Sequence, residues 1–324
     1  MSETASPFRR GRLLRIAAAL VVLLALAAYV VVQYVSGGGG PPRCLVRASD
    51  GSGDGSPSYE MTPEQAENAA TISAVGTTRG LPERAVTIAL ATALQESALR
   101  NLNHGDRDSL GLFQQRPSTG WGTEAQIQDP VYSAGQFYDH LVKVPGYSRL
   151  PLTEAAQRVQ RSGFPQAYAK HEPDATLLAA ALTGRSGATL TCTAPNGTEP
   201  GDPAKVRAAL VRDFGSEVLP GADAEGRAGA LGTAAEVSVP VSATTGGPTG
   251  DPENDGSASP RGWELAHWAV AQSTALRIDE VSYAGRVWSA KNTHTANKGW
   301  QRARASEQKS AGSGPAEVRI RTAQ

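Results

Sequence analysis

The chain has 324 residues, and its 31 basic and 31 acidic residues give a formal net charge of zero. This length has room for about two domains, and the balanced charge argues against a general nucleic-acid-binding protein. The 35 glycines and 21 prolines predict long linkers between the folded parts. We therefore expect six segments: a cytoplasmic basic tail (1–15), a transmembrane signal anchor (16–36), a flexible spacer (37–60), a main domain (61–217), a disordered linker (218–260) and a small accessory domain (261–324).

The first segment of the chain has the pattern of a signal anchor. An uncharged run, 16–35, follows the arginines Arg9, Arg10, Arg12 and Arg15. A helix of about 20 apolar residues can cross a bilayer, and the preceding basic residues place the N-terminus in the cytoplasm. The alternative is a cleaved signal peptide, but the run is longer than the apolar part of such peptides and lacks a small-x-small site. The sequence predicts a single-pass plasma-membrane protein whose bulk is extracytoplasmic.

The chain contains two cysteines, Cys44 and Cys192, and both follow the expected anchor. Disulfides persist outside the cytoplasm, so the two residues are expected to form a bridge around the main domain. The alternative is two unpaired thiols. Two cysteines and one spanning helix provide neither a soft-metal transport site nor a transport pathway.

Two helices are expected at the start of the main domain. Thr62 and Gln65 form a capping-box pattern that predicts a helix over 63–77, which Gly80 closes. A second pattern, from about Pro82 to Leu94, is apolar almost all round. Such a pattern is typical of a central, buried helix.

Glu96 is a lone carboxylate at the end of this buried helix. A polar loop, 101–108, follows it, and 111–115 is expected to begin another helix that lines a cleft. Apolar surroundings raise the pKa of a carboxylic acid, and an acid that is protonated near neutral pH can donate to a glycosidic oxygen. The alternative is a solvated glutamate after the last helical turn.

The string Gln95-Glu96-Ser97 followed by Gly111-Leu112-Phe113-Gln114-Gln115 resembles the soluble lytic transglycosylase and goose-type lysozyme superfamily. The additional strings Gly-Asp-Arg-Asp-Ser and Arg-Pro-Ser-Thr-Gly-Trp-Gly are similar to its actinobacterial branch. The resemblance implies a mainly α protein with a lysozyme-like helical domain that includes a short hairpin. It also implies cleavage of peptidoglycan glycan strands between N-acetylmuramic acid and N-acetylglucosamine, with Glu96 as general acid and then base, and no cofactor.

Asp106 and Asp108 are candidates for a second catalytic carboxylate. An inverting hydrolase needs a carboxylate that activates water about 6.5–9.5 Å from the acid. The alternative is that both aspartates cap turns, as loop aspartates often do. A lytic transglycosylase needs no such base, because the 6-hydroxyl of the sugar attacks. His104 lies beside them, but its surroundings in the sequence have no recognised metal-ligand spacing.

The resemblance also implies substrate contacts around the glutamine string. The candidate residues are Ser109, Gln114, Gln115, Trp121, Gln160 and Tyr168. Trp121 suits stacking on a sugar face, and its alternative role is an anchor of the loop or core. Gln160 and Tyr168 lie where many transglycosylases carry Ala-Tyr-Asn-Ala-Gly; this chain departs from that pattern, and Tyr168 is also a candidate core residue.

The C-terminal residues predict a small αβ domain. A helical pattern covers 263–276, and alternating patterns predict strands at 277–283, 286–290 and 317–321. The combination resembles a domain appended to secreted actinobacterial cell-wall enzymes, which implies a binding role. Glu264, His267 and His294 match no zinc-site spacing, and a buried helix histidine is the favoured interpretation.

Two classes of function remain from the sequence. The first is the peptidoglycan-cleaving enzyme, attached to the membrane by one N-terminal helix. The second is a wall-binding or scaffold protein that retains a lysozyme-like cleft without activity.

Overall fold

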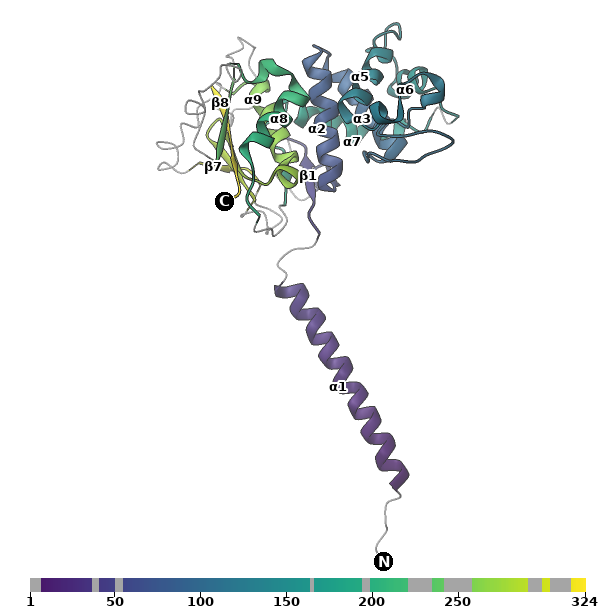
Figure 1. Cartoon of the computed structure of the whole chain (residues 1–324), viewed down its shortest axis with the longest axis vertical. Helices are drawn as coiled ribbons and strands as arrows, with labels where there is room; N and C mark the ends of the chain where they lie inside the picture. Colours follow the sequence, from purple (N-terminus) through teal and green to yellow (C-terminus); the bar gives the residue numbers. More distant parts are fainter. Residues whose placement is uncertain are drawn as a thin grey trace, which may run out of the picture. The chain divides into compact units, whose positions relative to one another are not determined.

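The computed structural model describes residues 7–36, 41–49, 55–163, 166–193, 199–220, 235–241, 258–290, 299–303 and 316–324. In the first of these ranges the side chains are described from 15 to 31. The chain forms two units, Met1–Pro41 and Pro42–Gln324 (Figure 1).

The first unit contains one helix, α1 (Pro7–Ser36), among its described residues. Within the described residues, no helix has both the length and the apolar character that a membrane crossing requires. The prediction of a transmembrane signal anchor is therefore wrong. That prediction depended on the uncharged run between Ile16 and Val35.

The second unit combines helices with two antiparallel sheets. Its helices are α2 (Pro63–Thr78), α3 (Glu83–Ser97), α4 (Glu124–Ile127), α5 (Pro130–Leu141), α6 (Leu152–Gln160), α7 (Glu172–Leu182), α8 (Pro203–Phe214), α9 (Pro260–Ala271) and α10 (Ser273–Leu276), with the 3-10 turns η1 (Pro117–Thr119), η2 (Ala169–His171) and η3 (Ser216–Val218). Its strands are β1 (Cys44–Arg47), β2 (Ser58–Met61), β3 (Leu190–Cys192), β4 (Glu236–Pro240), β5 (Ile278–Tyr283), β6 (Arg286–Ser289), β7 (Gln301–Arg302) and β8 (Glu317–Thr322).

The strands correct the expectation of a mainly α protein. About half of the described residues are helical, and the strands form a three-stranded sheet, β2-β1-β3, and a five-stranded sheet, β4-β8-β5-β6-β7. Strand β1 pairs with β3, which lies far away in the sequence, and local periodicity does not reveal such a pairing. Strand β4 lies inside 218–260, the range expected to be a linker. The strands expected at 277–283, 286–290 and 317–321 correspond to β5, β6 and β8.

Helix α2 is the centre of the second unit. It contacts α3, α5 and α7 as well as α8 and α9, so helices from both expected domains pack around it (Figure 1). Its start is capped as predicted, because the Thr62 side chain accepts from the Gln65 N–H and the Gln65 side chain accepts from the Thr62 N–H. Gly80 follows the helix with a φ of 70°, which suits glycine at a helix end.

Buried polar contacts join α9 to the helices that precede it in the sequence. The Asp213 carboxylate of α8 accepts hydrogen bonds from the Thr71 hydroxyl of α2 (3.0 Å) and from the Trp268 indole of α9 (2.8 Å). The Thr77 hydroxyl of α2 also donates to Glu264 of α9. Since these groups are buried or partly buried, α9 is part of the same core as α2.

The predicted disulfide is confirmed. Cys44 in β1 and Cys192 in β3 are directly opposed in the sheet, and their sulfur atoms are bonded. The bridge therefore closes a loop that contains the helices from α2 to α7.

Candidate active site

Glu96 lies in the last turn of α3 and is held by Tyr168. Eleven of the fifteen residues of α3 are buried, and the helix ends at Ala98 in a left-handed conformation. The Glu96 side chain is partly buried, and its Oε1 accepts a 2.7 Å hydrogen bond from the Tyr168 hydroxyl. Burial and the neighbouring Glu96 carboxylate raise the pKa of Tyr168, so the hydroxyl stays protonated and donates. Tyr168 is therefore both a core residue and a residue that contacts Glu96.

The glutamine string forms a tight turn, so the helix predicted at 111–115 is wrong. Leu110 and Gln115 exchange two backbone hydrogen bonds, and Gly111 and Gln114 have φ angles of 75° and 47°. A side chain at Gly111 would bring its Cβ within 2.7 Å of the Ile127 carbonyl oxygen, which explains the glycine. The turn is fixed to the end of α3 because the Ser97 hydroxyl donates to the Leu112 carbonyl (2.8 Å).

Helix α6 is attached to the same turn. The Gln160 side chain, at the end of α6, donates through Nε2 to the Phe113 carbonyl at 2.7 Å. The Phe113 ring stacks on Phe137 of α5 at a centroid distance of 4.7 Å. Three helices, α3, α5 and α6, therefore hold the turn next to Glu96.

Asp108 holds a loop. Its Oδ1 accepts from Arg116 Nε at 2.7 Å, and its Oδ2 accepts from the Ser118 N–H at 2.8 Å. Hydrogen bonds from Ser118 and then from Arg116 lower the pKa of Asp108 far below its usual range, so this carboxylate is ionised and both oxygens have partners. Asp106 is exposed, and its backbone carbonyl accepts from the N–H of Ser109, which is buried.

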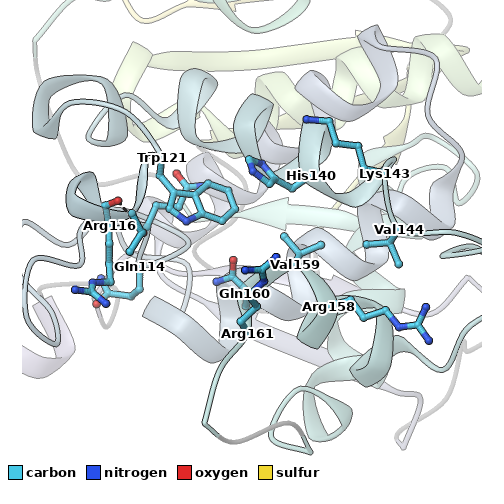
Figure 2. A pocket seen from close by; sticks show the side chains of 12 residues that line it. Gln114, Arg116, Trp121, His140, Lys143, Val144, Arg158, Val159, Gln160 and Arg161 are labelled. Carbon is cyan, nitrogen blue, oxygen red and sulfur yellow. Dashed lines mark hydrogen bonds between the residues drawn. The ribbon is translucent and has the colours of Figure 1, made fainter.

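A cleft of about 560 Å³ lies beside the turn (Figure 2). Four residues predicted from the sequence line it, namely Gln114, Gln115, Trp121 and Gln160. The other predicted residues lie outside its lining, and these are Glu96, Asp106, Asp108, Ser109 and Tyr168. The candidate acid is therefore not among the residues that line this cleft.

Arginine and lysine side chains dominate the charge of the cleft, and none of them was a site residue predicted from the sequence. Its lining includes Arg116, Lys143, Arg158 and Arg161 together with the imidazole of His140, and no carboxylate. Trp121 is partly buried and packs on His140, with ring centroids 4.2 Å apart. In Figure 2, Trp121 and His140 lie across the opening from Gln160 and Arg161. These residues come from separate helix ends and loops, so no local motif marks them.

Gln114 and Gln115 have different roles within the turn. Gln114 lies at the cleft and donates through Nε2 to the carbonyls of His104 and Gly111, at 3.3 Å each. Gln115 is buried and donates to the Ser133 carbonyl at 3.0 Å.

Comparisons with models of protein families and with curated proteins find no match for this chain. The functional assignment therefore depends on the residues of the site.

The contacts of His267 do not support a metal site in the C-terminal part of the chain. Its ring is fully buried between the Ala181 carbonyl (2.8 Å) and the Thr189 N–H (3.2 Å). Glu264 pairs with Arg261 at 2.8 Å, and His294 lies outside the described residues. No group of three or more His, Cys, Asp or Glu residues in the described ranges is arranged to hold a metal.

Proposed function

We propose that this protein cleaves the glycan strands of peptidoglycan, with Glu96 as the general acid and base. The observation that carries the proposal is the Glu96–Tyr168 pair at the end of the buried helix α3. Tyr168 fixes one carboxylate oxygen, and Oε2 has no protein hydrogen-bond partner within the described part of the chain. A carboxyl group held in this way can present a proton in one direction, which general acid catalysis requires.

The reaction has two proton transfers at Glu96. In the first, the protonated acid donates to the glycosidic oxygen while the bond from that oxygen to C1 breaks. In the second, the resulting carboxylate takes the proton of the 6-hydroxyl, whose oxygen bonds to C1 and closes an anhydro ring. The acid is regenerated, and no water is consumed.

The contacts of Asp108 favour this transglycosylase route over hydrolysis. A hydrolase that inverts the anomeric centre needs a carboxylate free to activate water. Both oxygens of Asp108 are occupied by Arg116 and Ser118, so Asp108 is poorly placed for that task. Asp106 is exposed and remains the candidate base of a muramidase reaction.

The disulfide supports a location outside the cytoplasm, where peptidoglycan lies. Disulfides persist in oxidising compartments and are rare in the cytosol. The Cys44–Cys192 bridge is therefore consistent with a protein that folds and acts on the outer side of the plasma membrane.

The second candidate function is a wall-binding protein without activity. The observation in its favour is that the lining of the cleft does not include Glu96. On this proposal, the cleft binds the glycan and the Glu96–Tyr168 pair only stabilises the end of α3.

Digestion of purified actinobacterial peptidoglycan separates the two proposals. The full chain is compared with Glu96→Gln and with Glu124→Gln, a matched change at an exposed glutamate of α4. Mass spectrometry then reads the products. We expect anhydro-muropeptides from the wild type and from Glu124→Gln, and none from Glu96→Gln. Reducing ends would instead indicate hydrolysis. An absence of products from a folded wild type that binds the glycan would overturn the enzyme proposal in favour of the binding protein.

A further inference from the structure

The cleft holds more positive charge than the composition of the chain would give it. The chain as a whole is neutral, with 31 basic and 31 acidic residues. Four basic side chains nevertheless line the cleft, and no carboxylate is among its described lining residues; the four are Arg116, Lys143, Arg158 and Arg161. A concave surface with charge of one sign concentrates ligands of the opposite sign. The cleft is therefore suited to an anion.

The four cations lie at separate positions around the cleft. Arg116 follows the turn 111–115, Lys143 follows α5, and Arg158 and Arg161 lie in α6 and at its end. In Figure 2, Arg116 and Arg158 lie on opposite sides of the view with Arg161 between them, and Lys143 lies on the side of His140. A ligand with one negative charge would leave most of these groups unused. The arrangement fits a ligand that carries several negative charges in series.

Three of these side chains keep donors for such a ligand. Arg116 is held in place because its Nε donates to Asp108 at 2.7 Å and its Nη2 to the Ser118 hydroxyl at 3.2 Å, which leaves Nη1. Lys143 and Arg161 are exposed, and neither forms an ion pair with another residue in the described ranges. The cleft thus combines one fixed guanidinium with two unpaired cations.

The backbone at the cleft is unusual at Gln114 and Arg161. Their φ angles are 47° and 51°, in the left-handed region that disfavours residues with a side chain. Arg161 closes α6 at a position where glycine or asparagine is usual, and its side chain lines the cleft. Backbone conformations of this kind concentrate at functional sites. An arginine at a position that suits glycine therefore indicates that its side chain has a function in the cleft.

We propose that this cleft binds a linear phosphodiester polymer of the poly(glycerol phosphate) type, with the basic side chains on successive phosphates. Such a chain carries one negative charge per repeat, which supplies charges in series. A guanidinium pairs with two oxygens of a phosphate at once, and this favours arginine at three of the four positions. Because the lining does not include Glu96, the inference stands apart from the proposed cleavage of glycan strands.

Nucleic acid is the other common phosphodiester polymer, and the cleft suits it less well. Binding of single strands uses aromatic side chains on which the bases stack. The described lining contains one tryptophan, Trp121, and its ring is packed on His140 at a centroid distance of 4.2 Å. The cleft therefore offers contacts to phosphates and little surface for bases.

Binding is measured by calorimetry with the full chain and a short poly(glycerol phosphate) oligomer. The other probes are inorganic phosphate, a thymidine oligonucleotide with the same number of phosphates, and a disaccharide muropeptide. The variant is Lys143→Gln with Arg161→Gln. Its matched control is Arg149→Gln with Lys205→Gln, which removes the same charge from two exposed residues outside the cleft lining.

The salt dependence of the affinity counts the phosphate contacts. Four contacts at about 0.7 each, the value for single-stranded polyanions, predict that the affinity of the wild type falls about 50-fold between about 50 and about 200 mM salt. The double variant keeps two contacts, so its affinity should fall only about 7-fold over the same range. The control should behave as the wild type.

Arg161→Gly separates binding from folding. Glycine adopts the left-handed region freely, so the midpoint of thermal unfolding should stay equal or rise. One contact is lost, and the affinity for the oligomer should therefore fall about 20-fold over the same salt range. A lower midpoint with unchanged binding would show that Arg161 is structural and would overturn the proposal.

Other results would also overturn the proposal. These are equal salt dependence in the wild type and the double variant, and inorganic phosphate that binds as tightly as the oligomer. Tighter binding of the oligonucleotide would assign the cleft to nucleic acid, and tighter binding of the muropeptide would assign it to the glycan. Glu96→Gln should bind the oligomer as the wild type does, so a failure of cleavage and a failure of polymer binding are separate results.

Discussion

Removal of the Cys44–Cys192 bridge should destabilise the protein strongly. The bridge joins residues that are 148 positions apart, and both are buried. For a closed loop of this length, the chain-entropy relation gives about 17 cal/mol/K, or about 5 kcal/mol at room temperature. This is comparable to the whole stability of many domains, so the bridge should decide whether the second unit stays folded.

The magnitude is tested by urea unfolding of the oxidised wild type and the double variant Cys44→Ala with Cys192→Ala. With a slope of about 2–3 kcal/mol per molar urea, the expected loss corresponds to a shift of the midpoint of about 2 M. The single variant Cys44→Ala breaks the same bridge and serves as the control, because it should unfold close to the double variant.

The contrary result is a shift below about 0.5 M urea between the wild type and the double variant. It would mean that β1 and β3 stay paired in the unfolded chain, or that the other contacts of β1 already impose the same restriction. In either case, the chain-entropy reasoning would be refuted for this protein.

Three further predictions concern the site and the core. Tyr168→Phe should lower the cleavage rate about 10-fold without loss of folding, because Glu96 keeps its place and loses one charge-assisted hydrogen bond. The digestion assay measures this rate, and a rate equal to wild type would show that Tyr168 does not position the acid. Asp213→Ala should lower the free energy of unfolding by about 3 kcal/mol, since the Trp268 indole and the Thr71 hydroxyl lose their buried acceptor. Asp213→Asn should lower it less. Thermal or urea unfolding measures both variants, and a loss below about 1 kcal/mol for Asp213→Ala would contradict the role of this contact. Burial lowers the pKa of His267 from 6.5 to about 4, so between these values only the unfolded chain binds the proton and stability falls as the pH falls, by about 3 kcal/mol in total. His267→Gln should remove that part of the pH dependence, and identical pH profiles of stability for the two proteins would be evidence against it.

The parts of the fold that depend on neighbouring residues could be predicted from the sequence. The capping box at Thr62 sets the start of α2 through contacts within one turn, and it was predicted correctly. The paired strands β1 and β3 could not be predicted, because their partners lie far apart in the chain. The turn at 111–115 was misjudged because an apolar pattern after a glycine also suits a helix start, whereas the structure pairs Leu110 with Gln115 and gives Gly111 and Gln114 positive φ angles.

The same distinction applies to the candidate site. The position of Glu96 at the end of a buried helix is visible as a local pattern, and its catalytic role was predicted from the downstream string Gly111–Gln115. Tyr168 was predicted only as a candidate contact, and its hydrogen bond to a residue 72 positions away is a property of the folded chain. Lys143 and Arg161 were missed, since an exposed cation has no distinctive pattern until the fold places it beside a cleft.

The position of α9 against α2 has a consequence for how the newly made chain matures. The ribosome completes α2 about 180 residues before α9 begins, which at usual synthesis rates is an interval of roughly 10 to 40 seconds. During that interval the side of α2 that α9 later covers has no partner from the C-terminal part of the chain, so the second unit cannot mature from the N-terminus onward. A nascent chain that stalls before Pro260 therefore lacks part of the core around α2, and this makes it a substrate for chaperones and proteases.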